Sequence, residues 1–290
     1  MNEADRNAEV LAALRRDDRD RYLCALAAPA SLRDDLAALY LFNAEVAGIA
    51  EKVSEPMLGL IRLQWWRDAF GEIAGNGMAA ERSHRHPLVQ NLADISARRD
   101  LDLASLGRIL DARERDLDAA QPEDLAALEA HVAATAGSLC EVAVSLCVTG
   151  ADPELRRIAR QVGTAYGLIG QMRAVPYLAR CGRVMVPASI MTEAQSSSEA
   201  LRKMKPDRHL PRAVAAVTER AAALIEQARR TPLQRGIRAG AMAALLPGRL
   251  AMLQLERLRR HGYDPFVPEA LAPSGLDIWR LLAARWLGRL

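Results

Sequence analysis

Apolar residues recur every three or four positions along most of this chain, which is the spacing of one face of an α-helix. Between residues 36 and 50 they form one such face. The Ser-Glu-Pro sequence at 54–56 then supplies an acceptor side chain, a carboxylate and a fixed φ, which together favour a helix start. The pattern predicts one helix that ends near Val53 and a second that opens at Ser54 and continues to Phe70.

The same spacing predicts a helix in the centre of the fold. Residues 131–149 are small and apolar, with Glu141 as their one charged residue. This length and this single carboxylate are typical of a buried core helix and not of a membrane span. Glu141 is expected either to reach the end of the bundle or to pair with an arginine such as Arg173.

The second half of the chain continues in the same way. Residues 188–211 are polar and predict a loop or a pair of short helices, whereas 212–230 and 240–261 predict long helices. A last amphipathic helix is expected over about 276–290. No repeat or low-complexity tract divides these segments.

Composition supports a helical fold. Half of the residues are hydrophobic and only 4% are aromatic, so the core must be built mainly from Leu, Ala, Val and Ile. No run of β-branched residues between turn signals is visible, and Ala and Leu favour helix. We therefore predict an all-α fold in which residues 1–290 form a single helical domain.

Charge and cysteine content exclude several classes of function. The net charge is +3, with acids and bases interspersed, whereas a nucleic-acid-binding protein would carry a clustered basic face. Cys24, Cys140, Cys147 and Cys181 lack the spacing of a zinc site or a disulfide framework. Buried free thiols are expected.

Two motif regions link the chain to a known family. The first region opens with Tyr-Leu-Phe at 40–42, directly before Asn43 on the predicted buried helix face. It continues with Leu-Gln-Trp-Trp-Arg-Asp at 63–68 on the next predicted helix. This arrangement resembles the squalene and phytoene synthase family, in which an acidic D-D-x-x-D motif follows a Tyr-x-Phe sequence. The resemblance implies a helical bundle of the isoprenoid synthase type. In this chain the motif positions are occupied by Ala47, Gly48, Ile49, Ala50 and Glu51.

The second acidic motif of the family is also altered. Its framework is similar to residues 163–178, followed by Cys-Gly-Arg at 181–183. The two aspartates of the family are Ala174 and Leu178 here. The polar Gln and Asn of the family are Gly167 and Gly170. Pro176 is expected to end this helix three residues after Arg173.

These replacements bear directly on catalysis. The family ionises an allylic diphosphate, whose charge is neutralised by Mg²⁺ held between carboxylates of two facing helices. A single glutamate, Glu51, cannot hold such ions. The resemblance therefore implies no catalytic residue, no metal site and no cofactor in this chain.

Local sequences resemble one branch of the family in particular, the phytoene-synthase-like assembly factors of respiratory complex I. They are found at 41–45, 53–56, 173–177 and 263–268. This resemblance implies a non-catalytic protein that assists complex I assembly, with complex I subunits or assembly intermediates as partners and no nucleic acid. The expected location is the cytoplasm, either free or peripheral to the inner face of the inner membrane.

Two alternatives remain open at this level. An active head-to-head prenyltransferase would require Mg²⁺, with Glu51 plus Glu141 or Asp111 as replacement ligands. A binder of prenyl diphosphate or lipid would use arginines, because guanidinium groups match phosphate oxygens. The candidates are Arg62, Arg67, Arg173 and Arg183, each of which could equally form a structural ion pair.

The last helix has two interpretations. Helical spacing places Trp279, Leu282, Trp286 and Leu290 on one face, with Arg285 and Arg289 beside it. Indoles at headgroup level and arginines near anionic lipid are typical of an interfacial helix. The alternative is a terminal helix that packs on the bundle, and a contact with a protein partner is a third use of the same face.

Overall fold

The computed structural model describes residues 3–75, 86–99, 101–118 and 120–288. Within these residues every regular element is a helix, which confirms the all-α prediction. The elements are α1 (Glu3–Asp17), α2 (Arg19–Ala27), α3 (Ala30–Ala47), α4 (Ile49–Lys52), α5 (Pro56–Ala74), α6 (Pro87–Arg98), α7 (Leu103–Glu114), the 3-10 turn η2 (Arg115–Leu117), α8 (Leu125–Val132), the π-helical segment η3 (Ala133–Gly137), α9 (Ser138–Cys147), α10 (Pro153–Arg173), α11 (Val175–Arg180), α12 (Ala188–Glu193), α13 (Ser198–Arg202), α14 (Leu210–Arg230), α15 (Arg235–Arg260), α16 (Pro268–Leu271) and α17 (Asp277–Leu287).

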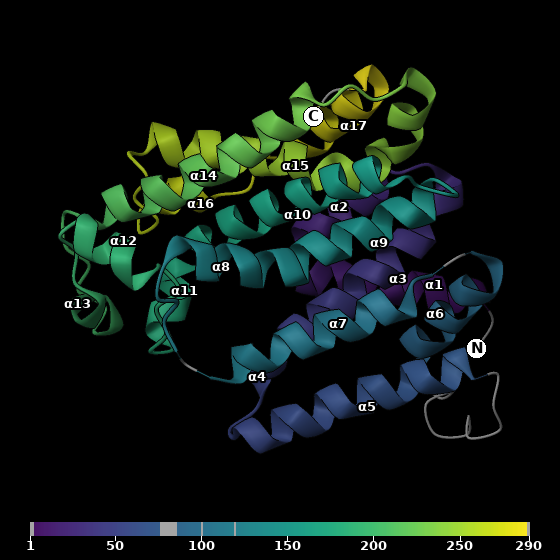
Figure 1. The fold of residues 1–290 in the computed structure, drawn as a ribbon, viewed down its shortest axis with the longest axis horizontal. Helices are drawn as coiled ribbons and strands as arrows, with labels where there is room; N and C mark the ends of the chain where they lie inside the picture. The colour runs from purple at the N-terminus through teal and green to yellow at the C-terminus, as the bar shows by residue number, and fades with distance from the viewer. Residues whose placement is uncertain (1–2, 76–85, 100, 119, 289–290) are drawn as a thin grey trace.

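Helix α10 is the centre of the bundle. It packs against α14 and α15 on one side and against η3 and α9 on the other (Figure 1). Glycines permit the second contact, because a Cβ at Gly163 would lie 2.3 Å from the Ala136 carbonyl oxygen and 2.7 Å from the Cys140 Cβ. At Gly167 a Cβ would lie 2.4 Å from Val132. These two glycines, four residues apart on one face, set the short distance between the central helices.

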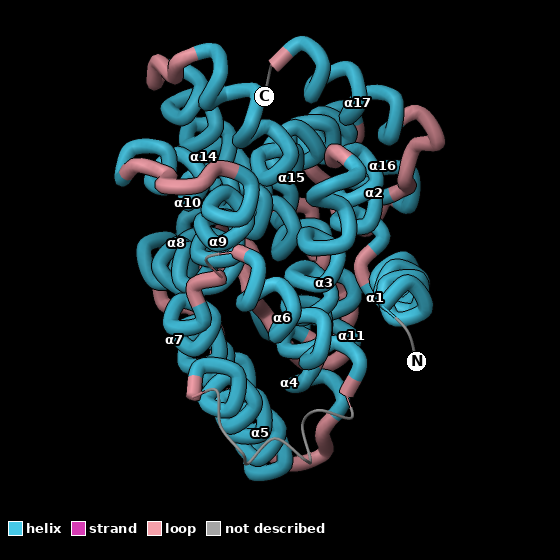
Figure 2. The backbone as a smooth tube through the Cα atoms, turned by 90° about the vertical axis from the view of Figure 1, so that its right-hand side faces the viewer, coloured by secondary structure: helices cyan, strands magenta, loops and turns pink. Residues whose placement is uncertain are grey.

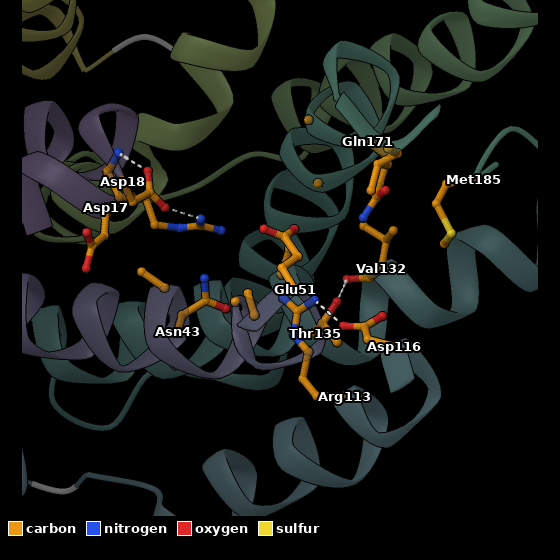
Figure 3. A pocket seen from close by; sticks show the side chains of 18 of the residues that line it. Asp17, Asp18, Asn43, Glu51, Arg113, Asp116, Val132, Thr135, Gln171 and Met185 are labelled. Atoms are coloured by element: carbon orange, nitrogen blue, oxygen red, sulfur yellow. Dashed lines mark hydrogen bonds and ion pairs between the residues drawn. The ribbon is translucent and has the colours of Figure 1, made fainter. Parts of the chain in front are cut away.

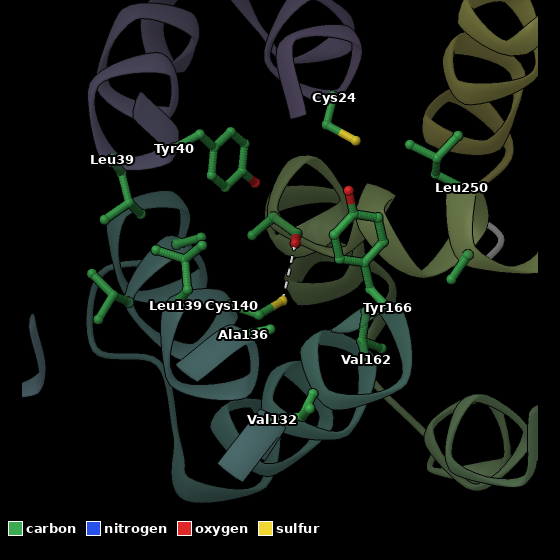
Figure 4. Close-up of a cluster of buried hydrophobic side chains, with 14 of the residues drawn as sticks. Cys24, Leu39, Tyr40, Val132, Ala136, Leu139, Cys140, Val162, Tyr166 and Leu250 are labelled. Atoms are coloured by element: carbon green, nitrogen blue, oxygen red, sulfur yellow. Dashed lines mark hydrogen bonds between the residues drawn. The ribbon is translucent and has the colours of Figure 1, made fainter. Parts of the chain in front are cut away.

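The centre of the core is mostly aliphatic, with a few thiols and phenols. Figure 4 shows Tyr40, Cys24 and Tyr166 close together, and the Cys140 thiol donates to the Ala244 carbonyl at 3.2 Å. Cys24 and Cys140 are buried as expected. Cys181 contradicts that expectation, because it lies in the exposed turn after α11.

The apolar middle segment forms part of this core. By length and hydropathy alone, Leu125–Cys147 could cross a bilayer. However, 67% of the apolar 18-residue stretch within it is buried inside the bundle. This burial agrees with the predicted core helix. Glu141 pairs with an arginine, as one of the two expectations had it, but the partner is Arg160 at 2.8 Å and not Arg173.

The first motif region differs from the sequence expectation in two details. The predicted continuous helix stops at Ala47 and resumes as the short α4, with Gly48 at φ −82° and ψ −2° between them. Ser54 does not cap the next helix, because α5 begins at Pro56 after Glu55, whose side chain makes no capping bond. The fixed φ of proline at the first helical position is the start signal that applies here.

The second motif region follows the prediction more closely. Helix α10 ends at Arg173, as expected from Pro176. The proline then lies in the first turn of a new short helix, α11, because a helix start tolerates the missing N–H. The polar segment 188–211 contains the two short helices α12 and α13, which confirms that prediction.

A buried ion pair connects α3 to the end of α6. Asp35 is 3% exposed and accepts from Arg99 Nε at 2.6 Å and from Arg98 at 3.2 Å. Arg99 also donates to the carbonyls of Ser31 and Leu146. The Asp35 carboxylate thus connects α3 to the end of α6, and Arg99 extends the connection to α9.

Helix α5 lies at the edge of the bundle, next to α7 (Figure 2). It buries only a narrow stripe that includes Gly59 and Leu63, and a Cβ at Gly59 would lie 2.2 Å from Leu117. The large apolar residues of its other face, Ile61 and Trp65 among them, are exposed.

Candidate functional site

The altered motif regions meet at a cavity of about 440 Å³. It lies between α3, α4, α10 and α11, and the segments around Arg113 and Arg183 close its other side. Figure 3 shows Asp17 and Asp18 on one side and Arg113 and Asp116 on the other. The ionisable side chains that line it are Asp17, Asp18, Arg21, Glu51, Lys52, Arg113, Asp116 and Arg183. Four are acidic and four are basic, so their formal charges cancel.

The structure brings most of the altered motif positions to this cavity. Ala47, Gly48 and Glu51 line it from the first motif, and Leu178 lines it from the second. Ala174 is the residue that caps α10 and is not part of the lining. Glu51 accepts a hydrogen bond from the Tyr177 hydroxyl at 2.9 Å, which connects α4 to α11. The one motif carboxylate is therefore already bonded.

Asp116 is an acid of the cavity with several partners, and it lies outside the motifs recognised in the sequence. Its carboxylate lies 2.8 Å from Arg113 Nη1 and 2.9 Å from His131 Nε2. Arg183 donates to its backbone carbonyl at 3.0 Å. Burial alone would raise the pKa of Asp116, but Arg113 and His131 beside it lower that pKa to about 2. The carboxylate is thus charged at neutral pH and holds Arg113.

A second pair lies across the cavity. Asp18 caps α2 by accepting from the Arg21 backbone N–H at 2.9 Å, and its other oxygen accepts from the Arg21 guanidinium at 2.7 Å. The same guanidinium stands 4.8 Å from the centre of the Tyr166 ring. Arg21 is therefore held on two sides. The i, i+3 spacing in both Asp18–Arg21 and Arg113–Asp116 was the available sequence signal.

Of the four arginines proposed from the sequence as phosphate ligands, only Arg183 lines the cavity. Arg62 is exposed on α5. Arg67 pairs with Asp111 at 2.8 Å and with Glu114 at 2.5 Å, two acidic residues on the surface of α7. Arg173 pairs with Asp20 at 2.9 Å, and Asp20 also accepts from Gln254.

The donor atoms around the cavity do not fit the magnesium cluster of an active synthase. Ala47, Gly48 and Leu178 offer no side-chain oxygen, although Mg²⁺ needs several carboxylate oxygens in near-octahedral geometry. Within the described residues, no group of three His, Cys, Asp or Glu side chains lies close enough to hold a metal ion. The replacement ligands considered above, Glu141 and Asp111, are paired with Arg160 and Arg67 and lie outside the lining.

Comparison with known proteins gives the family. The sequence model of squalene/phytoene synthase matches residues 14–286 of this chain. The chain belongs to the squalene/phytoene synthase family.

Solved structures of this family share the fold. A dehydrosqualene synthase in complex with ligand aligns with a TM-score of 0.81 at 18% identity, over 98% of this chain and 96% of that chain. Squalene synthase HpnC from Alicyclobacillus acidocaldarius aligns with a TM-score of 0.74 at 18% identity, over 90% of this chain and 96% of that chain. Both confirm the predicted isoprenoid synthase bundle.

Two relatives of similar sequence bear one name. The Bos taurus protein is 30% identical over 92% of this chain and 80% of the relative. The Mus musculus protein is 29% identical over the same shares of each chain. Both are named NADH dehydrogenase (ubiquinone) complex I, assembly factor 6.

Glu45, on α3 beside the cavity, gives the first testable prediction. Burial raises the pKa of Glu45 from its ordinary value of 4.5 to about 7, although Lys52 lowers it. The folded state therefore binds the proton more tightly than the unfolded state, and the free energy of unfolding falls as pH rises from 4.5 to about 7. Glu45→Gln should stabilise the fold at pH 8 by about 1–2 kcal/mol, after allowance for partial solvent screening.

Urea unfolding of both proteins at pH 4.5 and pH 8 measures this effect. The stability difference should nearly vanish at the lower pH, where the wild-type carboxyl is largely neutral in the folded protein. An equal gain at both pH values would show that the glutamine acts by packing and not by removing a charge.

Proposed function

We propose that this squalene/phytoene synthase family member assists the assembly of respiratory complex I and does not catalyse prenyl transfer. The observation that carries the proposal is the balanced cavity, in which four acidic and four basic side chains neutralise one another. Arg21 and Arg113 are bonded to Asp18 and Asp116 and are not free to take phosphate. The names of the relatives supply the process in which the protein would act.

The charge balance opposes diphosphate chemistry for a physical reason. A diphosphate leaving group carries several negative charges, and its departure needs a net positive site, either metal ions or unpaired cations. Here the one motif acid is bonded to Tyr177, and two of the four cavity cations, Arg21 and Arg113, have carboxylate partners. For a prenyl-diphosphate or lipid binder without chemistry, Arg183 and Lys52 are the cavity cations outside these two ion pairs.

A pyrophosphate-release assay tests the non-catalytic part. Purified protein with farnesyl or geranylgeranyl diphosphate and Mg²⁺ should release no pyrophosphate above the no-enzyme rate, whereas an active dehydrosqualene synthase in the same buffer should. A variant in which Ala47, Gly48, Ala174 and Leu178 are all replaced by aspartate is assayed beside the native protein, as the sample with the family carboxylates restored. Release by the native protein, or a hydrocarbon product, would contradict the proposal and support the prenyltransferase alternative.

Deletion of the gene tests the assembly role. Membranes of the deletion strain should lose most of their NADH:quinone oxidoreductase activity, and the wild-type gene should restore it. Complex I subunits or assembly intermediates are the proposed partners, and the proposed place of action is the inner face of the inner membrane. Full complex I activity in the deletion strain, with normal assembly on native gels, would rule out this role.

A further inference from the structure

Helix α17 has an apolar outer face that no described residue covers. Trp279 is 67% exposed and Trp286 is 91% exposed, while Leu276 and Leu287 are 58% and 63% exposed. Leu276 directly precedes α17, and the other three residues lie on this helix. Helix α17 lies at the edge of the bundle near the C-terminus (Figures 1 and 2). Two solvent-exposed indoles on one short helix indicate a contact surface, whereas a single exposed apolar residue would need no explanation.

The helix that carries this face is firmly attached. Its inner side buries Leu281 and Ala284 against α15 and α2. Asp277, at its first turn, is 2% exposed and pairs with Arg257 at 2.9 Å. At the other end Arg285 donates to the Ala27 carbonyl at 2.9 Å. The tryptophans therefore project from a fixed helix, and they cannot turn inward without breaking these contacts.

The structure changes the sequence-based description of this face. Leu282 is partly buried and packs on the core, and it does not belong to the outer face. Arg285 is half-buried and bonded within the protein. Arg289 and Leu290 lie outside the described residues. The outer face within the described chain consists of Leu276, Trp279, Arg280, Ala283, Trp286 and Leu287.

Charge distinguishes this face from the other exposed apolar helix. The only acid of α17 is the buried Asp277, which lies 3.8 Å from Arg280 Nη1, and the one charged side chain on the outer face is Arg280, 43% exposed. Near Ile61 and Trp65 of α5, in contrast, the exposed charged side chains are the carboxylates of Glu55, just before the helix, and Asp68, together with Arg62. An anionic surface would thus attract the outer face of α17 more than that of α5, where two acids outnumber one arginine.

We propose that the outer face of α17 inserts into the interfacial layer of a bilayer that contains anionic phospholipid, with the helix axis parallel to the membrane plane. Trp279 and Trp286 are two turns apart, or about 10 Å along the axis, so both indoles reach the same depth. The helix has 11 residues and a length of about 16 Å, too short to span a bilayer. Indoles at the headgroup level and arginine at lipid phosphate are the contacts expected of such a helix.

Vesicle sedimentation with the full-length protein tests this proposal. The protein should bind vesicles of phosphatidylcholine and phosphatidylglycerol in equal parts, and its tryptophan emission should shift to shorter wavelength. The double variant Trp279→Ser/Trp286→Ser should bind at least about tenfold more weakly, because it lacks the apolar area that enters the interface. Arg280→Glu should reduce binding to these vesicles to the level seen with phosphatidylcholine alone, because it removes the charge contact with anionic lipid.

A matched control removes apolar area of similar kind from the other helix. Ile61→Ser/Trp65→Ser on α5 should leave vesicle binding unchanged, and circular dichroism should show all variants folded. If the wild-type protein binds neither vesicle, or if the α17 double variant binds as the wild type does, the proposal is wrong. The vesicles contain no complex I component, so this result is independent of the assembly role.

Discussion

Gly163→Ala should destabilise the protein by about 2–4 kcal/mol, although alanine favours helix over glycine. The added methyl would lie 2.3 Å from the backbone oxygen of Ala136 and 2.9 Å from the Cα of Gly137. Backbone atoms of the neighbouring helix cannot move aside as a flexible side chain can. The central pair of α10 with η3 and α9 would have to separate, with loss of packing along its length.

Gly170 provides the matched control on the same helix, because a Cβ there meets nothing within 4 Å. Gly170→Ala should be neutral or stabilise by up to about 1 kcal/mol, as expected from helix propensity alone. Urea unfolding of the three proteins at neutral pH measures both effects. Equal stability changes in the two variants would show that close packing at Gly163 is not what requires a glycine.

Asp35→Ala should destabilise the protein by about 1–3 kcal/mol, because the arginines left behind, Arg98 and Arg99, are 52% and 31% exposed and can be partly hydrated. The substitution leaves Arg99 with no carboxylate partner at a place where Asp35 is 3% exposed. The comparison variant is Asp111→Ala on α7, which removes a carboxylate from a surface pair with Arg67 whose acid is 65% exposed. That change should have an effect below about 1 kcal/mol, since surface ion pairs contribute little.

Thermal unfolding at low and high salt separates the two cases further. The Asp111 pair should weaken with added salt, whereas the buried Asp35 pair should hardly respond. A loss below about 1 kcal/mol in Asp35→Ala would mean that α6 tolerates the unpaired arginine, for example by turning it into solvent. The ion pair of Asp35 with Arg98 and Arg99 would then contribute little to the stability of the fold.

Local pattern predicted the helices well, because helix formation depends on the spacing of apolar residues and on nearby start and stop signals. The end of α10 before Pro176 and the long helices α14 and α15 are examples. The loss of the motif carboxylates was also visible in the sequence, since it concerns residue identity alone. The break at Gly48 was not, because glycine is only mildly unfavourable within a helix.

The ion pairs between segments far apart in the sequence could not be predicted in the same way. Arg173 meets Asp20, which is 153 positions away, and Arg99 meets Asp35 from another helix. Such pairs depend on how whole helices pack, and no local spacing encodes them. For this reason three of the four candidate phosphate ligands, Arg62, Arg67 and Arg173, lie outside the cavity, although the sequence placed them with Arg183.

The bonded arginines of the cavity also bear on evolution. A descendant that regained the family aspartates by mutation would still hold Arg113 against Asp116 and Arg21 against Asp18. Three further negative charges, at positions 47, 48 and 178, would line a cavity whose formal charges now cancel, and the fold would become less stable before any metal was bound. Under the proposed non-catalytic function, prenyl transfer would therefore require several of these substitutions together, because one added aspartate supplies too few ligands for Mg²⁺.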